Sequence, residues 1–380
     1  MNSRVLSAPQ KYRLCQLCSE RQGVAPSSFE IVRAKQCFVC AGVTDRTRRM
    51  AEVAVSKARR FQAKTFTVGV SIPEGVQERE DELRATLKLK GSETIKTQMA
   101  RFISSQVSAR LGIRLDRSRP DITLLADFTK GDVLVTSRPV FVYGRYTKPV
   151  GISQKRLVCE HCRGAGCRKC HNTGFEQKTS VEGLVRRKLA NFAGSDRMTF
   201  TWLGSEDRGS RVYPPGRPFV AEVKNPRKRK FPRSFGSRFR GGSVTASAVR
   251  VLASKPLQMP SFRFVTKIKA TAASKVTSEE LSELKSTFRR AEVRFDRPNN
   301  RPTTKMVYWV SAKAKGRNIL IEAELDGGLP VKRFVGGELV SPSVSEVLKT
   351  QVGCRSFDIF RVKETRGFAF AEITRNEEKN

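Results

Sequence analysis

Eight of the nine cysteines lie in Cys-x-x-Cys pairs, which combine into two sets with the spacings C-x2-C-x18-C-x2-C and C-x2-C-x4-C-x2-C. A short pair can bind one side of a tetrahedral ion, and such spacings are typical of structural zinc sites. We therefore predict two zinc ions, with unliganded thiols as the alternative at each set. The predicted ligands are Cys15, Cys18, Cys37 and Cys40 in the first set, and Cys159, Cys162, Cys167 and Cys170 in the second.

Few other histidine or cysteine residues could bind a metal ion. His161 and His171 are the only histidines, and each is either an alternative ligand of the second set or an exposed loop residue. Cys354 stands alone and is predicted to be a small core residue. A closed four-cysteine site has no open coordination position, so both predicted zinc ions are structural and do no chemistry.

An acidic pair, Glu206-Asp207, follows an apolar strand and lies in a strongly basic stretch with Arg208, Arg211 and Arg217. Neighbouring arginines would hold such a carboxylate ionised, and an ionised carboxylate can act as a nucleophile. Taken by spacing alone, an acidic turn on a basic surface explains this stretch better.

The charge of the chain restricts its partners. Lysine and arginine number 73 against 36 aspartate and glutamate, which gives a formal net charge of +37 and a pI near 10.5. A polyanion would offset this excess, and nucleic acid fits best because each neutralised phosphate releases a counterion. A merely soluble basic protein is the alternative, and a membrane surface is disfavoured because no long amphipathic basic helix occurs.

Localisation is predicted from the same survey. No apolar run approaches the roughly 20 residues of a membrane-spanning helix, and residues 1–10 lack the apolar stretch of a secretory signal. We expect a cytoplasmic protein without a membrane partner, in a compartment where cysteines bind metals more often than they form disulfides.

Hydrophobic periodicity predicts an α/β module followed by a sheet domain. The module has a strand over 66–72, a helix over 92–111 capped by Ser92, and strands over 122–126, 132–136 and 139–143. A second helix is expected over 181–193, with Ser180 as its cap and Gly194 after its end. Beyond it, strands are predicted at 198–203, 219–224, 244–252, 262–268, 292–295, 306–310, 319–324, 357–362 and 368–373, with helices at 278–289 and 344–352 and a loop over 225–242.

This pattern predicts an α+β protein whose C-terminal sheet is largely antiparallel. We divide the chain into an N-terminal zinc-binding region (1–50), an α/β module (51–150), a four-cysteine knuckle or linker (151–178) and a C-terminal domain (179–380).

The acidic stretch resembles the active-site region of the archaeal-type tRNA pseudouridine synthases that act on uridines 54 and 55. That family reads Gly-Arg-Glu-Asp, then Gly-Arg-Pro-Phe, then an Asn-Pro-Arg element. The residues that match in register are Gly204, Glu206, Asp207, Arg211, Gly216, Arg217, Pro218, Phe219 and Asn225-Pro226-Arg227. Further blocks resemble the family in the knuckle, in the segment 328–335 and in the module, which is similar to the family's THUMP-containing region.

The resemblance implies a tRNA pseudouridine synthase, an isomerase that modifies uridine 54 or 55, or both, in the TΨC arm. It implies tRNA as the partner, structural zinc, no organic cofactor and no small-molecule substrate. The implied catalytic residues are Asp207, Lys332 and Arg211. The implied substrate-binding residues are Arg145, Arg217, Phe219, Lys224, Arg227, Lys228 and Arg229.

Two departures from the family pattern keep an alternative open. Ser205 replaces the motif arginine, and Pro330 stands where the family has a tyrosine that packs against the target uracil. The alternative is a catalytically impaired tRNA-binding protein or RNA chaperone of the same fold, in which Asp207 performs no reaction.

Two other classes of protein are alternatives for the chain as a whole. A different THUMP-bearing tRNA enzyme, such as a thiouridine synthase or methyltransferase, would need a Gly-rich phosphate or cofactor loop, and the sequence has none. A ribosomal or DNA-binding zinc protein would leave the block around Asp207 unexplained. The basic segment from Lys224 to Arg240 either grips the RNA backbone, with Phe231, Phe235 and Phe239 stacking on bases, or is a solvated run.

Overall fold

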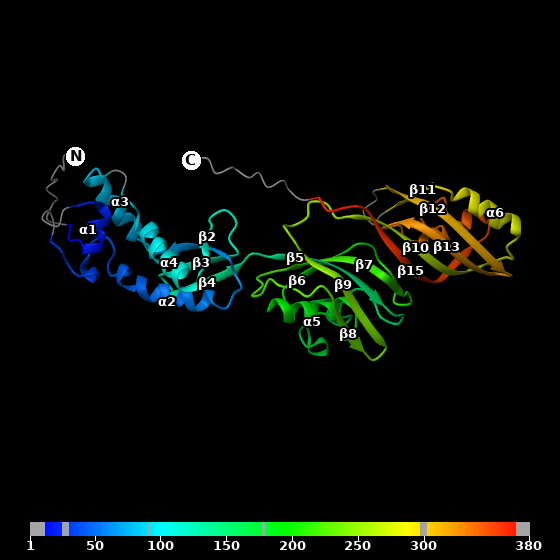
Figure 1. Cartoon of the computed structure of the whole chain (residues 1–380), viewed down its shortest axis with the longest axis horizontal. Helices are drawn as coiled ribbons and strands as arrows, with labels where there is room; N and C mark the ends of the chain where they lie inside the picture. The colour runs from blue at the N-terminus through cyan, green and yellow to red at the C-terminus, as the bar shows by residue number, and fades with distance from the viewer. Residues whose placement is uncertain (1–11, 25–29, 90–91, 177–178, 297–301, 370–380) are drawn as a thin grey trace. The chain divides into compact units, whose positions relative to one another are not determined.

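The computed structural model describes residues 12–24, 30–89, 92–176, 179–296 and 302–369 (Figure 1). It forms two compact units. The first comprises the chain up to Pro139 together with Lys224–Arg229, and the second comprises Val140–Val223 and the chain from Lys230 onward. None of the helices in these described ranges combines the length and the apolar character needed to cross a bilayer.

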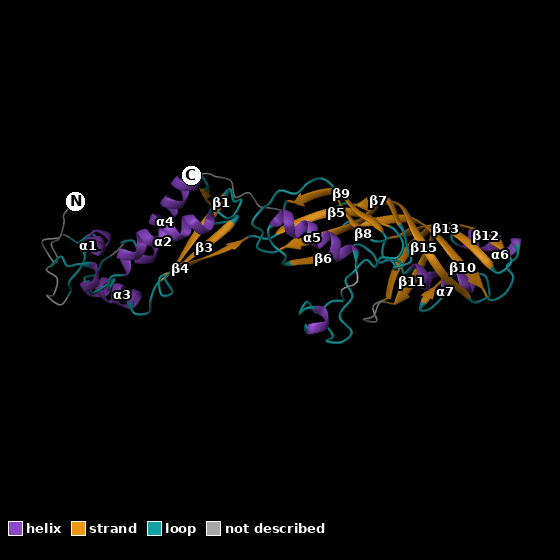
Figure 2. Ribbon diagram, turned by 90° about the horizontal axis from the view of Figure 1, so that it is seen from below, coloured by secondary structure: helices purple, strands orange, loops and turns teal. Residues whose placement is uncertain are grey.

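The first unit is an α/β structure built on a small sheet with the strand order β2-β1-β3-β4. Strand β1 pairs in parallel with β2 and β3, and β3 pairs antiparallel with β4. Helices α2 and α4 pack against each other and against this sheet (Figures 1 and 2). The strands are β1 (Thr65–Ser71), β2 (Arg114–Leu115), β3 (Ile122–Asp127) and β4 (Asp132–Ser137), and the helices are α1 (Gln16–Gln22), η2 (Ala34–Gln36), η3 (Val43–Arg46), α2 (Thr47–Ala58), α3 (Val76–Thr86) and α4 (Ile95–Leu111).

Helix α4 shows why the first unit folds as it does. Its apolar residues recur every three or four positions, and the buried ones form a single stripe toward the sheet. Thr94 caps the helix by accepting a hydrogen bond from the Thr97 amide, so the predicted cap at Ser92 was wrong by two residues. Gly112 ends it in the left-handed conformation, at φ 66°.

The cysteine region and the α/β module share one hydrophobic core. Buried residues of the first cysteine set belong to the same cluster as Phe66 of β1 and Met99 of α4. Structurally, therefore, the predicted boundary at residue 50 does not separate two bodies, because α2 already spans it.

The second unit is dominated by a large mixed sheet with the strand order β14-β11-β12-β13-β10-β15-β7-β5-β9-β8, with β6 added beside β7. All its strand pairs are antiparallel within the described ranges except β15 with β7. The strands are β5 (Val140–Lys148), β6 (Met198–Trp202), β7 (Val212–Val223), β8 (Phe235–Phe239), β9 (Gly242–Leu252), β10 (Ser261–Ala272), β11 (Ala291–Asp296), β12 (Pro302–Lys315), β13 (Asn318–Asp326), β14 (Val340–Ser341) and β15 (Val352–Arg366).

Helices lie beside both halves of this sheet (Figure 2). Helix α5 contacts β8 and β9, whereas α6 contacts β12 and α7 contacts β15. Ser180 caps α5 by accepting from the Gly183 amide, as the sequence predicted. The helices are η4 (Arg168–Cys170), α5 (Val181–Ala193), α6 (Ser278–Thr287), α7 (Val331–Gly336) and α8 (Val344–Val347).

Several predicted elements differ from the structure. The predicted loop over 225–242 contains β8, which forms a hairpin with β9. The helix predicted over 344–352 ends at Val347, and β15 begins at Val352. Phe368 and Ala369 form no strand, and the rest of the strand predicted over 368–373 lies outside the described residues.

Strand β5 also falls on the other side of the predicted boundary. It was assigned to the module ending at residue 150, but it pairs with β7 and β9 inside the second unit. Sequence periodicity could not show this, because a strand carries the same alternation whichever sheet it joins.

Candidate active site

Asp207 lies in the loop between β6 and β7, next to the first turn of α7. Its Oδ2 is 2.7 Å from Nζ of Lys332, the second residue of that short helix. The Asp207 side chain is 40% exposed, so the carboxylate remains accessible to a ligand. The hydrogen bond that Lys332 donates to Asp207 raises the pKa of Lys332, and the ammonium therefore stays charged through neutral pH. The structure thus joins a carboxylate and a cation that lie 125 positions apart in the sequence.

A buried lysine holds the backbone of this loop. Lys148, at the end of β5, is 2% exposed, and its ammonium donates to the carbonyl oxygens of Asp207 (2.8 Å), Ser210 (2.6 Å) and Ile152 (2.9 Å). Burial lowers the pKa of Lys148, while the nearby carboxylates oppose that change. Because these contacts are to main-chain oxygens, the loop is fixed while the Asp207 side chain stays available.

Glu206, the residue before Asp207, has a buried carboxylate instead of an accessible one. The Glu206 side chain is fully buried and lies 3.2 Å from the guanidinium of Arg217. It also accepts hydrogen bonds from the Tyr146 hydroxyl (2.6 Å) and the Gln154 amide (3.1 Å). Burial raises the pKa of the Glu206 carboxyl, and the Arg217 guanidinium opposes this. Glu206 is therefore a positioning residue, whereas Asp207 faces outward.

Arg217 connects this buried pair to the loop. Its guanidinium donates to the carbonyl oxygens of Ser205 (2.9 Å) and Leu203 (3.2 Å). Gly204 is needed between them because a Cβ there would overlap the Arg217 guanidinium, and its φ of 100° also favours glycine. The predicted role of Arg217 in contacting substrate is corrected by its 4% exposure, since its donors are directed to the loop.

Phe219 is also a core residue rather than a substrate contact. It is fully buried, and its ring packs within 6.0 Å of Phe200 and Trp202 and within 6.4 Å of Tyr146. Because Phe219 has no accessible surface in this structure, its position favours support of the site from the core over the predicted contact with substrate.

Arg211 lies near Asp207 in sequence, but its polar contacts are with Asp358 and Tyr213. Its backbone amide donates to Asp358, and its guanidinium lies 3.4 Å from the Tyr213 hydroxyl. The ring of Tyr213 stacks on Phe360, with centroids 4.3 Å apart and planes 13° apart. Tyr213 is the second residue of β7, directly after the loop, whereas Phe360 belongs to β15, and both residues are half-buried.

Arg145 also makes mainly internal contacts. Its guanidinium donates to the Tyr143 hydroxyl and to the carbonyl of Val362, and it lies 5.5 Å from the ring centroid of Phe262. Its structural role is to connect β5 with β15, although the side chain is only partly buried.

The predicted basic residues at 224–229 belong to the first unit. Lys224, Arg227 and Lys228 are exposed there. Arg229 is half-buried, and it donates to the carbonyl oxygens of Asp121 and Arg138 and to the Ser137 hydroxyl. Arg229 therefore helps to hold the segment on the small sheet, which limits its capacity to contact a ligand.

The first cysteine set brings four thiols together between α1 and the segment after η2. All four residues are at most 5% exposed, and their sulfur atoms lie within 4.8 Å of one another. Those of Cys15 and Cys40 are 3.7 Å apart. An ion bound tetrahedrally at about 2.3 Å from each sulfur would place the sulfurs about 3.8 Å apart. The donor set and its spacing therefore fit one tetrahedral metal ion.

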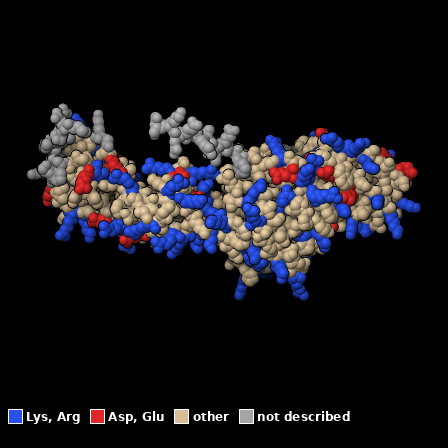
Figure 3. All heavy atoms as spheres, viewed as in Figure 1, with Lys and Arg blue, Asp and Glu red and all other residues tan. Residues whose placement is uncertain are grey.

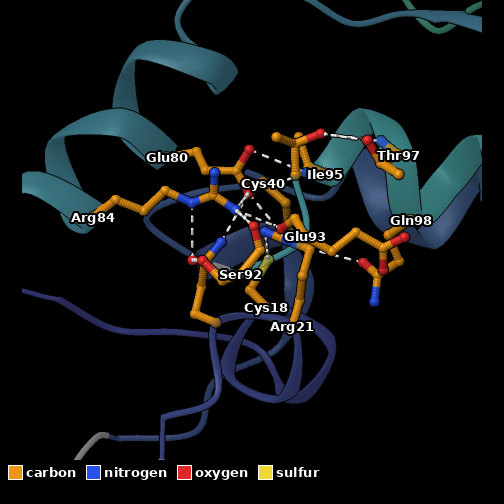
Figure 4. A network of polar contacts seen from close by, with 12 residues as sticks. Cys18, Arg21, Cys40, Glu80, Arg84, Ser92, Glu93, Ile95, Thr97 and Gln98 are labelled. Atoms are coloured by element: carbon orange, nitrogen blue, oxygen red, sulfur yellow. Dashed lines mark hydrogen bonds and ion pairs between the residues drawn. The ribbon is translucent and has the colours of Figure 1, made fainter. Parts of the chain in front are cut away.

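A buried polar network joins this cluster to α3 and α4 (Figure 4). The Arg21 guanidinium lies 3.4 Å from the sulfur of Cys18 and donates to Glu80 of α3 at 3.0 Å. Glu80 in turn accepts from the amide of Ile95, the first residue of α4. The cysteine cluster is therefore connected directly to the helices that cover the small sheet.

The second cysteine set has the same sulfur geometry in a smaller loop. Sulfur–sulfur distances are 4.0 Å for Cys159–Cys167, 3.8 Å for Cys162–Cys170 and 3.7 Å for Cys167–Cys170. Backbone amides, including that of Gly174 at 3.3 Å from Cys170, point at the sulfurs and favour thiolates. The histidines that flank this set, at 161 and 171, are exposed and are not part of the ligand cluster.

Sequence reasoning missed the residues that position Asp207. Tyr146, Lys148 and Gln154 all support the loop, and nothing in their spacing marks them as polar residues to be buried. Cys354 is only partly buried and lies near Asp207 and Lys332, and burial raises its pKa to about 11.

The two units contain a small α/β sheet and a large mixed sheet that presents an accessible aspartate beside a lysine. Comparison with known proteins identifies this combination. A family model described as "Pus10 THUMP domain, archaeal" matches residues 50–127, and one described as "Pus10, C-terminal" matches residues 141–363. Because the second match alone spans more than half of the chain, the chain belongs to the Pus10 tRNA pseudouridine synthase family.

Curated relatives agree over most of their length. A protein of Cenarchaeum symbiosum named tRNA pseudouridine synthase Pus10 is 30% identical over 337 residues, covering 88% of this chain and 83% of the relative. A protein of the same name from Nitrosopumilus maritimus is 28% identical over 367 residues, covering 93% and 96%. Among solved structures, an archaeal box H/ACA Nop10–Cbf5 complex aligns at 11% identity with a TM-score of 0.31, covering 60% of this chain and 48% of that one. That likeness is too weak to carry an argument.

Proposed function

We propose that this protein isomerises a uridine of tRNA to pseudouridine, and that the target is uridine 54, uridine 55 or both in the TΨC arm. One observation carries the proposal: the accessible Asp207 carboxylate lies 2.7 Å from the Lys332 ammonium, in the segment that resembles the family's active site. The family match and the names of the curated relatives support the same reaction.

The reaction redistributes bonds within one nucleotide. The bond from N1 of uracil to C1′ of ribose breaks, the ring rotates, and a bond forms from C5 to C1′. The proton on C5 is lost and one is gained at N1, so atoms and electrons balance without a cofactor. Asp207 acts either as the nucleophile at C1′ or as the base that starts cleavage of the glycosidic bond.

The surrounding residues of the second unit divide the remaining tasks. Lys332 pairs with Asp207 and fixes its orientation. Glu206 and Arg217 hold the loop from the buried side. A uridine must leave its stack to reach this carboxylate, and we assign the half-buried Tyr213, which stacks on Phe360, as the aromatic side chain that packs against it.

The first unit is proposed to dock the tRNA. Its α/β module matches the THUMP family model, and its exposed Lys224, Arg227 and Lys228 are suited to phosphate contacts. Contacts of this kind position an RNA by shape and charge without reading its sequence. We propose the cytoplasm as the site of action, because cysteines there bind metals more often than they form disulfides, and eight cysteines of this chain lie in two four-cysteine clusters.

Zinc is the metal we propose for both cysteine clusters, because four thiolates in tetrahedral spacing suit zinc. Bound zinc would hold the fold, and in the second cluster it would fold a short loop that has little core of its own. No step of the isomerisation is assigned to either ion.

The alternative of an impaired tRNA-binding protein rests on the two departures from the family pattern. Ser205 is exposed and contributes its carbonyl oxygen to Arg217. Pro330 caps α7 immediately before Val331 and Lys332, so it replaces an aromatic side chain beside the site. The assay that separates the two functions is direct detection of product.

The test uses unmodified tRNA transcripts and nearest-neighbour or mass-spectrometric detection of pseudouridine. Wild-type protein is expected to modify a transcript with both uridines and to lose product at a position where uridine is replaced by cytidine. Absence of product from every transcript, together with intact tRNA binding, would establish the impaired binder instead.

A further inference from the structure

A basic groove on the second unit lies between helix α5 and the hairpin β8–β9, and none of its lining residues belongs to the loop that holds Asp207. Its first part is a cavity of about 650 Å³ lined by Arg187 and Lys188 of α5 and by Ser237, Arg238 and Thr245 of the hairpin. Here it is called the α5 groove. Figure 3 shows blue side chains projecting along the edge of this unit where Figure 1 draws α5 and β8.

A second cavity of about 500 Å³ extends the groove. It shares Arg187 and Arg238 with the first, so the two are continuous. Its far wall includes Arg156 and Phe175 of the four-cysteine segment and Arg240 of the hairpin. The groove therefore runs from the hairpin along α5 to the knuckle.

In the second cavity Arg156 is paired with Glu182, and Glu176 adds a carboxylate to the lining, but in the described part of the chain the cations of the first cavity have no such partner. Arg187, Arg238 and Arg240 are exposed, and no carboxylate within the described residues forms an ion pair with them or with Lys188. The lining of the first cavity includes three cations and no carboxylate. Cations gathered without counterions favour an anionic ligand.

A buried hydroxyl supplies an independent sign of a ligand. Ser237 is only 7% exposed and lines the first cavity. Its Oγ has no hydrogen-bond partner among the residues that the structure describes. A buried hydroxyl costs stability unless something satisfies it, and a ligand oxygen in this cavity would do so.

The lining favours a sugar–phosphate backbone over other anions. Serine, threonine and asparagine side chains next to arginines are typical contacts to phosphate and ribose. The aromatic residues nearby are not free to stack on bases, since Arg156 covers the ring of Phe175 at 3.7 Å and Phe239 packs on the core. An acidic peptide would bring carboxylates to the same arginines, but the first cavity has little apolar lining for its other side chains.

We propose that the α5 groove is a second RNA-binding surface, which grips the backbone of the RNA outside the catalytic pocket without reading its sequence. The inference rests on the proposed function, because that function supplies the RNA. It gives the hairpin β8–β9 and the knuckle a shared purpose, namely to form the two walls of the groove.

The test is the salt dependence of binding to an unmodified tRNA transcript by the triple variant Arg187→Gln/Lys188→Gln/Arg238→Gln. Loss of two or three phosphate contacts should reduce the slope of log affinity against log salt by about 2. Affinity near physiological salt should fall about tenfold or more, while the single-turnover rate at saturating enzyme stays within about twofold. The matched control, Lys275→Gln/Lys285→Gln/Arg289→Gln, removes three exposed cations beside α6 and should leave the slope close to wild type.

A second variant guards against misfolding. Ser237→Ala removes only the unsatisfied hydroxyl, so the fold should be kept, and tRNA affinity should fall about two- to fivefold. An unchanged salt slope in the triple variant would overturn the proposal. A triple variant that loses binding to a polyglutamate peptide but keeps its affinity for RNA would also overturn it, because the groove would then bind an acidic peptide. If wild-type protein forms no pseudouridine but the slope still falls, the groove stands and only the proposed reaction fails.

Discussion

Replacing Arg217 with methionine should destabilise the second unit strongly. The Arg217 side chain is 5% exposed, and its guanidinium forms one ion pair with Glu206 and two hydrogen bonds to loop carbonyls. The variant leaves the Glu206 carboxylate buried, with only the Tyr146 hydroxyl and the Gln154 amide as donors. Breaking one side of a buried ion pair typically costs about 3–5 kcal/mol. We expect a value near 3, because the two donors that remain satisfy part of the charge.

The assay is urea unfolding followed by tryptophan fluorescence. The only two tryptophans, Trp202 and Trp309, both lie in the second unit, so the signal reports that unit. Trp202 packs against Tyr146 at 5.4 Å and therefore reports the neighbourhood of the pair. With a slope of about 2–3 kcal/mol per molar urea, the midpoint should fall by roughly 1–1.5 M.

Two further variants make the prediction specific. The double variant Glu206→Leu/Arg217→Met removes both charges and should recover most of the lost stability, because an uncompensated carboxylate no longer remains. Arg187→Met, an exposed arginine without an acidic partner, should change the free energy of unfolding by less than about 0.5 kcal/mol. A midpoint for Arg217→Met equal to that of wild type, or a double variant no more stable than the single one, would refute the argument.

Three further outcomes are expected. Metal analysis of the full chain should give close to two zinc ions, and Cys15→Ser or Cys162→Ser should each reduce this by one; fewer than one ion in wild type would contradict the metal assignment. Affinity for tRNA should fall steeply as salt rises, and a flat dependence would mean that the charge is not the binding surface. Because the pKa of Lys332 is raised, its ion pair is complete below the ordinary lysine pKa of about 10.5 and is lost only as pH rises through the higher folded value. The ratio of wild-type to Lys332→Met single-turnover rates should thus stay constant between about pH 7 and 9, and a ratio that falls to one in that range would count against the pair.

Much of the fold followed from local pattern. Helix α5 was predicted to its ends because a serine cap, an apolar stripe and a terminal glycine agree at one place. The helix α3 was missed because only Val76 and Leu83 are its buried apolar residues, and Glu80 occupies the third buried position. Its stability depends on the polar network with Arg21, which periodicity cannot show.

The site was predictable only in part. Resemblance singled out Asp207 and Lys332, and spacing alone could not have joined two residues on different elements. Neither the resemblance nor the spacing could show which of two neighbouring side chains points into the core and which points to solvent. Glu206 and Asp207 are adjacent and chemically equivalent, yet one is buried beside Arg217 and the other is accessible. Arg217, Tyr146 and Gln154 hold Glu206 on the buried side, whereas Lys148 binds only the backbone carbonyl of Asp207 and leaves its side chain accessible.

The most direct test of the account is single-turnover isomerisation of an unmodified tRNA transcript by Asp207→Asn. The substitution keeps the size of the side chain and removes its charge, and Asp196→Asn, at another exposed aspartate of the second unit, is the matched control. We predict that Asp207→Asn binds tRNA within about twofold of wild type and forms no detectable pseudouridine, whereas Asp196→Asn behaves as wild type. Product formed by Asp207→Asn at the wild-type rate would contradict the assignment of the reaction to this carboxylate.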